Sequence, residues 1–449
     1  MSGLFLMALG FGLGAFGLGA LGLAGEAQAN DGISTSVSGE VNFYAMAFQD
    51  DPSNGADDDA LFLSPQAKLS LGANLTDTID FNLDLFGSLS NQENGHIGIF
   101  HEPGEEHRQP AFLDATQGYF SYLGESITLK VGKAVVENGF AELASSADRF
   151  GRADGSNPQL TRDIGVFQAR ADVFVGDDTV TMMVMPFHEK SYVPAEKSRW
   201  AGSSGDADFQ SLTLPTGNLA TGSARIQDRF HSTNPKNAGY LVKYEGRRQA
   251  FDFYGLAHHG PSVYPVVRQR VATDALYEKV DPLATSVAAG VSTVVDAWKF
   301  YGEGIAQLTD AGRDEDFVRY TLGASYRMTD LANAIGLDEI KPILEWSGDE
   351  SFDGQREGEY IVDSSEARPL SNAIVAQIEI QHNSDVSYGL GGAYHVEEND
   401  FSITLGAEYR PTDNLTFNLS AAYYEGKDDT HFGRWKENEN IMFAAGYTF

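Results

Sequence analysis

The feature that most constrains this chain is an alternation of apolar and polar side chains that recurs, segment after segment, from Ile33 onward. In the clearest segment, Phe401–Tyr409, every second residue from Phe401 is apolar or aromatic, and those between are Ser, Thr, Gly and Glu. Successive side chains of a β-strand point to opposite faces, so this period predicts strands with one apolar and one polar face. A soluble β-sandwich would show the same alternation with its apolar face turned inward, so one segment does not identify the fold.

The lengths of the connectors between these segments separate the two folds. Short connectors occur at 76–78, 124–125, 176–178, 246–248, 296–297, 383–385 and 411–414. Longer, polar connectors occur at 49–60, 90–111, 136–162, 188–237, 259–282, 309–315, 348–370, 397–400 and 425–440. The two classes largely take turns, although the connector 330–339 is long for a turn and 397–400 is short for a loop. Short periplasmic turns that alternate with long extracellular loops are typical of outer-membrane barrels, whereas a sandwich has no reason to follow this order.

The sequence therefore predicts an all-β fold, a transmembrane antiparallel β-barrel of about 18 strands, within a range of about 16–18. A barrel of this size is wide enough to leave an aqueous channel. One such barrel accounts for residues 30–449 as a single domain.

Composition excludes several classes of function. The 449 residues contain no Cys, which removes disulfides, thiolate nucleophiles and Cys-based metal or haem sites. The formal net charge of −33 argues against nucleic acid as a partner, because phosphate binding needs clustered Lys and Arg. A mean hydropathy of −0.27, without a long apolar run after the first thirty or so residues, excludes a bundle of transmembrane helices.

The first residues resemble an export signal. Leu4–Leu23 is apolar and Gly-rich, and Ala27-Gln28-Ala29 follows it as a small-x-small cleavage pattern. We expect residues 1–29 to be a signal peptide, with Asn30 as the first residue after cleavage. The segment departs from a standard signal because no Lys or Arg precedes the apolar run. The alternative, an anchor helix, is disfavoured by the many glycines.

The last strand carries a family resemblance. In the segment Ile441–Phe449, apolar and aromatic residues again share one face, and the segment ends on Phe449. This resembles the assembly signal of Gram-negative outer-membrane porins. The resemblance implies a passive or substrate-selective channel for small hydrophilic solutes or ions in the outer membrane. It also implies lipid and lipopolysaccharide as surroundings and a homotrimer as an assembly to test.

If the apolar strand faces meet lipid, the opposite faces line the lumen. They carry both signs of charge, at Lys68, Asp80, Asp84, Lys130, Gln168, Arg170, Asp172, Lys243, Glu245, Lys299, Glu303, Arg319, Arg327, Lys341, Glu345, Gln377, Glu379, Glu408 and Arg410. The aromatics expected in a lipid-facing interfacial girdle are Trp298, Tyr326, Tyr409, Tyr423 and Tyr447. Those expected on the lumen side are Tyr44, Phe86, Tyr119, Tyr301 and Tyr424, where they could line a path for sugar-like solutes.

The porin resemblance also implies that the third long loop, Val136–Arg162, folds into the lumen and narrows it. This loop lacks the Pro-Glu-Phe-Gly-Gly pattern of general porins. Arg149, Arg152, Arg162 and Arg170 lie in or beside it and could form a constriction ring that attracts anions. The alternative is ordinary pairing with nearby acids, at Asp148, Asp154, Asp163 and Asp172.

Motifs for catalysis or for cofactors are absent or weak. The sequence has no Gly-x-Ser-x-Gly elbow, no His-Glu-x-x-His and no phosphate-cradling loop, so it predicts no enzyme, no cofactor and no metal site. We expect His258-His259 to be a solvated pair at the extracellular rim, and the acidic runs near Asp57 to be solvated loops rather than a calcium site.

Two alternatives to a porin stay open. One is an export or conduit barrel that sheathes a polysaccharide or a periplasmic electron carrier and needs a wide lumen without an inserted loop. The other is an outer-membrane barrel hydrolase.

Overall fold

The computed structural model describes residues 33–52, 57–92, 111–195, 198–202, 208–209, 225–228, 237–269, 276–356 and 358–449. The expected signal peptide, residues 1–29, lies outside these ranges, and the division of the chain at residue 30 stays a prediction.

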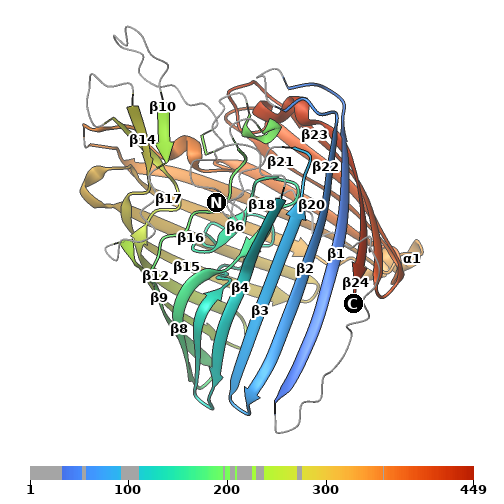
Figure 1. Cartoon of the computed structure of the whole chain (residues 1–449), viewed down its shortest axis with the longest axis horizontal. Coiled ribbons are helices and arrows are strands. Elements are labelled where there is room, and N and C mark those ends of the chain that lie inside the picture. The colour runs from blue at the N-terminus through green and yellow to red at the C-terminus, as the bar shows by residue number, and fades with distance from the viewer. Residues whose placement is uncertain are drawn as a thin grey trace.

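Eighteen strands form one antiparallel sheet that closes on itself (Figure 1). They are β1 (Ser34–Phe48), β2 (Leu61–Thr76), β3 (Ile79–Leu89), β4 (Ala111–Leu123), β5 (Ile127–Ala134), β8 (Val166–Val175), β9 (Asp178–Met185), β11 (Gly239–Arg247), β12 (Asp252–Pro261), β15 (Leu283–Val295), β16 (Trp298–Thr309), β17 (Asp316–Tyr326), β18 (Glu339–Asp353), β20 (Ala373–Gln381), β21 (Val386–His395), β22 (Phe401–Thr412), β23 (Leu415–Glu425) and β24 (Asn440–Thr448). Each pairs with the next, and β24 pairs with β1. The prediction of an outer-membrane-type barrel of about 18 strands is confirmed.

The outer face of the barrel is apolar, as the alternation predicted. Leu405 on β22, Leu419 on β23 and Val287 on β15 are each more than half exposed, whereas the residues beside them along the strand face inward. Trp298 and Tyr326 pack together on this outer face with ring centroids 4.5 Å apart, beside the short turns. Aromatic rings on the outer face near the turns of a barrel are typical of the girdle that anchors it at the membrane interface. Among the described residues, no helix is long and apolar enough to cross a membrane.

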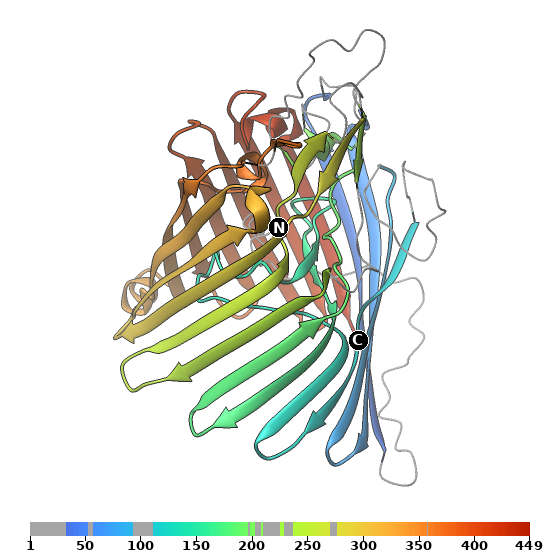
Figure 2. The same ribbon diagram turned by 90° about the vertical axis from the view of Figure 1, so that its left-hand side faces the viewer.

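Short and long connectors lie at opposite ends of the barrel, and Figure 2 shows the short turns along its lower rim. The connector expected at 330–339 contains a short helix, α1 (Thr329–Ala334), which explains its length. The loop expected to begin at residue 348 begins later, because β18 continues to Asp353 and pairs with β17 beyond the last contact with β20. That part of the prediction was wrong.

The long connectors carry structure of their own. A separate four-stranded sheet combines β10 (Arg225–Asp228), β13 (Val266–Gln269), β14 (Leu276–Val280) and β19 (Tyr360–Val362), which come from three different loops. In the described parts of the connectors there are also short 3-10 helices: η2 (Arg199–Ala201), η4 (Asp310–Gly312), η5 (Ser365–Ala367) and η6 (Gly433–Asn438). The alternation of strand residues did not predict any of these elements.

Phe449 takes part in closing the barrel. Its N–H donates to the carbonyl of Gly39 on β1 at 2.9 Å, and the N–H of Gly39 donates to the Phe449 carbonyl at 2.9 Å. The aromatic ring covers Gly39, since a Cβ placed on that glycine would lie only 2.5 Å from it. The last residue therefore extends the β1–β24 ladder by one pair.

We expect deletion of Phe449 to reduce the amount of folded barrel, because it removes both of these hydrogen bonds and the ring contact at the closing strand pair. The measurement is the fraction of heat-modifiable protein on a gel after assembly. Phe449→Tyr, which keeps both backbone bonds and an aromatic ring, is the control. Assembly of the deletion variant at the wild-type level would contradict this role.

Candidate functional site

The connector between β5 and β8, residues 135–165, lies inside the barrel. It includes the hairpin of β6 (Arg152–Asp154) and β7 (Arg162–Ile164), which Figure 1 places within the ring of strands. Its first half contacts β15 to β18, and its second half contacts β1, β2 and β23. β15 to β18 lie on the opposite side of the barrel from β5, so the first half of the loop crosses the lumen.

Glu345 on β18 holds the first half of this loop. Its carboxylate accepts hydrogen bonds from the backbone N–H groups of Glu142, Leu143 and Ala144 at 2.7, 2.9 and 2.6 Å. The Tyr301 hydroxyl donates to it as well, at 2.5 Å. Glu345 is 1% exposed. A buried carboxylate that accepts several N–H groups makes charge-assisted bonds, which are stronger than bonds between neutral groups.

Glu303 on β16 makes a second anchor of the same kind. It accepts from the Phe140 N–H at 2.5 Å, from the Ser145 hydroxyl at 2.5 Å and from the Tyr254 hydroxyl at 3.3 Å. The alternation placed Glu303 and Glu345 on the lumen face correctly, but nothing in the sequence indicated that they hold a loop.

Glu142 reverses this arrangement, because the loop supplies the acid and the wall supplies the bases. Its carboxylate lies 3.0 Å from the Lys299 ammonium and 2.6 Å from that of Lys341, and it accepts from the Ser325 hydroxyl at 3.0 Å. The loop is thus tied to the β16–β18 wall by three carboxylates within a short stretch.

Arg149 is buried between the loop and the same wall. One of its nitrogens, Nη2, donates to Ser286 Oγ at 2.9 Å and to Gln307 Oε1 at 2.7 Å. Its Nε and Nη1 atoms have no hydrogen-bond partner, and no carboxylate lies within ion-pair distance of it among the described residues. A guanidinium stays protonated in proteins, so Arg149 carries a positive charge that no adjacent acid neutralises.

The other three arginines expected at a constriction each have a carboxylate partner. Arg152 lies 3.5 Å from Glu189, Arg162 lies 3.3 Å from Asp154, and Arg170 lies 2.8 Å from Asp172. The last two pairs are among those that the alternative interpretation expected. Arg162 lies beside β2 and Arg170 lies on β8, whereas Arg149 lies against β15 and β16. The structure therefore does not bring the four together into one group.

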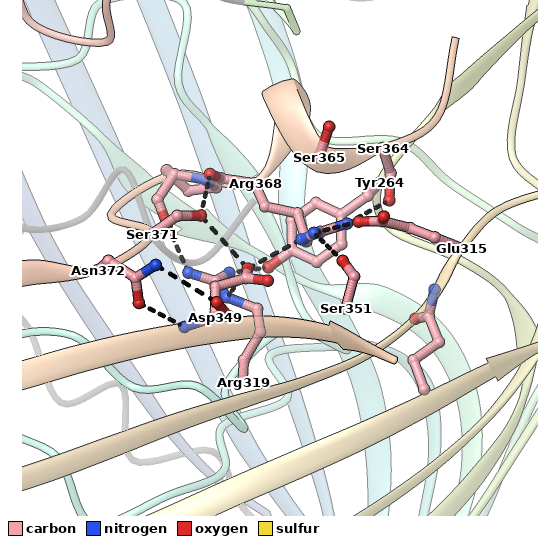
Figure 3. A network of polar contacts seen from close by, with 12 residues as sticks. Tyr264, Glu315, Arg319, Asp349, Ser351, Ser364, Ser365, Arg368, Ser371 and Asn372 are labelled. Atoms are coloured by element: carbon pink, nitrogen blue, oxygen red, sulfur yellow. Dashed lines mark hydrogen bonds and ion pairs between the residues drawn. The ribbon is translucent and has the colours of Figure 1, made fainter. Parts of the chain in front are cut away.

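A second basic cluster surrounds Tyr264 (Figure 3), whose ring also lies near Arg149. Arg319 and Arg368 both pair with Asp349, at 3.1 and 2.8 Å, and Arg368 also pairs with Glu315. The guanidinium carbons of Arg149 and Arg319 lie 5.5 and 5.6 Å from the centroid of the Tyr264 ring. The sequence placed Arg319 in the lumen but gave no signal for Arg368, which lies in a long loop.

The described residues 186–195 and 198–202 of the connector after β9 reach across the mouth of the barrel. Arg199 donates to the carbonyls of Asp50 and Asp59 at 2.8 and 3.1 Å and to Asn438 Oδ1 at 2.9 Å. Trp200 packs edge-on against Trp435, with ring centroids 6.0 Å apart. Tyr192 exchanges backbone hydrogen bonds with Ala153 and Gly155 of the inserted hairpin. This connector therefore links the inserted loop to the rim formed by the β1–β2 connector and η6.

The expectation that His258 and His259 form a solvated pair was wrong for His258. Neighbouring residues of a strand point to opposite faces, so the two rings separate. His258 is 7% exposed and packs on Phe150 of the inserted loop with ring centroids 4.4 Å apart. His259 is exposed on the outer face and lies 3.0 Å from Thr285 Oγ1.

The chain resembles known proteins in structure but not in sequence. No protein-family model matches the chain, and no curated protein matches its sequence. The crystal structure of Pseudomonas aeruginosa OccK8 (OprE) matches with 10% identity and a TM-score of 0.52, over 92% of this chain and 98% of that one. Acinetobacter baumannii OccAB1 matches with 9% identity and a TM-score of 0.51, over 95% of this chain and 99% of that one. This likeness shows that the chain has the fold of Gram-negative outer-membrane porin-like barrels.

Proposed function

We propose that the protein is an outer-membrane channel that allows small hydrophilic solutes or ions to diffuse through its lumen. The observation that carries the proposal is the inserted loop 135–165, held inside a closed barrel by Glu303 and Glu345. An apolar outer face suits lipid, and a polar inner face suits water. A loop that crosses the lumen narrows the path and brings fixed charges close to whatever passes.

We propose that Arg149 gives the narrowing a local preference for anions, because the carboxylates of Glu303 and Glu345 beside it are engaged by N–H and hydroxyl donors. Arg152, Arg162 and Arg170 are each next to a carboxylate that offsets their charge, whereas Arg149 is not. Arg319 and Arg368 lie close by, but they share Asp349 and Glu315. The contribution of all four predicted arginines to a constriction remains a proposal.

The inserted loop argues against the conduit alternative. A barrel that sheathes a polysaccharide or an electron carrier needs a wide, unobstructed lumen, and residues 140–149 occupy part of it here. The proposed surroundings are outer-membrane lipid and lipopolysaccharide on the outside and small solutes within, and the homotrimer stays a prediction. The test of the proposal is whether the purified, folded protein passes ions across a planar lipid bilayer.

A further inference from the structure

Three side chains that can bind metal ions meet in the short connector between β21 and β22, at the end of the barrel that carries the long loops. One potential ligand atom each from His395, Glu398 and Asp400 lies within 4.8 Å of the other two. His395 is 3% exposed and Asp400 is 0% exposed, so this is not a set of acids spread over a solvated surface. His395 Nδ1 lies 2.6 Å from Asp400 Oδ1.

A second histidine reaches the same place from the connector between β23 and β24. The N–H of His431 donates to Glu398 at 3.1 Å, so its side chain starts beside the carboxylates. Its ring is 5.2 Å from that of His395, centroid to centroid, at an angle of 75°. His431 is 5% exposed, and its ring nitrogens have no hydrogen-bond partner among the described residues. We call His395, Glu398, Asp400 and His431 the rim cluster.

We propose that the rim cluster binds one divalent transition-metal ion, with zinc(II) the best match. Imidazole nitrogen suits zinc, copper, nickel and cobalt, whereas calcium and magnesium prefer sites made only of oxygen ligands. His395, Glu398 and Asp400 supply three ligands of a tetrahedral site, and the fourth would be water or, after a shift of its ring, the neighbouring His431. The two carboxylate charges would offset the charge of the ion.

A contact outside the cluster also orients one of its ligands. The N–H of Phe432 donates to Asp400 Oδ2 at 2.5 Å, which fixes the direction of that carboxylate. Ligands oriented by such outer contacts bind metal more tightly.

A metal ion here would strengthen the link between two loops that the N–H bonds of His431 and Phe432 already connect. η6 begins two residues after His431, and its Trp435 donates through Nε1 to the Trp200 carbonyl at 2.9 Å. Asn438, the last residue of η6, accepts a hydrogen bond from Arg199 Nε and donates one to the Arg199 carbonyl. The ion would therefore stabilise the loop that holds Arg199 and Trp200 over the mouth. This inference does not depend on the proposed channel function.

The test uses the whole folded chain, purified without a histidine tag and treated with a chelator, with zinc(II) or cobalt(II) as the only added ligand. Calorimetric titration is expected to show one zinc ion bound per chain. Cobalt(II) is expected to give the strong visible absorption of a tetrahedral site. His431→Gln and Glu398→Gln are each expected to weaken binding by about 10- to 100-fold.

His259→Gln is the matched control, because it removes an imidazole from the outer face, away from the rim cluster. Heat-modifiability on a gel confirms that each variant is folded before it is titrated. Absence of zinc binding by the wild-type protein would overturn the proposal. Binding that is equally strong in the His431 and Glu398 variants would overturn it too, because the ion would then sit elsewhere.

Discussion

Replacing Arg149 with Gln is expected to shift the ion preference of the channel toward cations. The substitution removes a buried positive charge that no adjacent carboxylate offsets, and Gln can still bond to Ser286 or Gln307. A unit charge about 8 Å from a passing ion contributes about 2 kcal/mol at an effective dielectric constant of about 20. Salt screening reduces this value, so we expect a change of roughly three- to tenfold in the ratio of chloride to potassium permeability.

Arg152→Gln is the control for this measurement. Arg152 belongs to the same loop, but Glu189 already offsets its charge at 3.5 Å. Reversal potentials in a potassium chloride gradient should therefore move far less for this variant than for Arg149→Gln. Equal shifts from the two variants, or no shift from Arg149→Gln in a conducting barrel, would show that Arg149 does not set the preference.

Replacing Glu345 with Ala is expected to release the inserted loop and to raise the conductance of the channel. Three backbone N–H groups, those of residues 142–144, lose their acceptor together with the Tyr301 hydroxyl. Leaving a buried donor unpaired costs about 1–3 kcal/mol per group. A loop position in which water solvates these N–H groups is therefore favoured. An unobstructed barrel of this size holds an aqueous channel, and we expect the single-channel conductance to rise roughly twofold with added current noise.

Glu379→Ala serves as the control for loop release. Glu379 lies on the neighbouring strand β20, opposite Lys341, and contacts Lys341 and Gln377 rather than the loop. The substitution removes a lumen carboxylate of the same charge, leaves the bonds of Glu303 and Glu345 to residues 140–145 in place, and leaves Lys341 paired with Glu142. A conductance change of the same size in both variants would mean that lost charge, and not loop release, is the cause.

The membrane-facing part of the fold could be predicted from the sequence because lipid imposes a strict rule on it. Phe401–Tyr409 alternates because every second side chain must be apolar where its neighbour is lipid, and the segment forms β22 as expected. The same rule placed Glu303 and Glu345 on the lumen face. The alternation is not required where a strand extends beyond the membrane. For this reason the continuation of β18 to Asp353 was predicted as a loop.

The contacts of the candidate site could not be predicted, because they join residues far apart in the chain. Arg149 is separated by 137 residues from Ser286 and by 158 from Gln307. Periodicity reports on which face of its own strand a residue lies, and it says nothing about which residue lies opposite across a lumen. Arg368 and His431 are further cases, since both lie in irregular loops whose conformation depends on partners from other loops.

The measurement that tests the central claim most directly is the current through a planar lipid bilayer after addition of the purified, heat-modifiable wild-type protein. The account predicts discrete upward steps of equal size, each from the insertion of one conducting unit, with a reversal potential on the anion side in a potassium chloride gradient. Insertion of folded protein that produces no current steps would contradict the claim that this barrel is a channel.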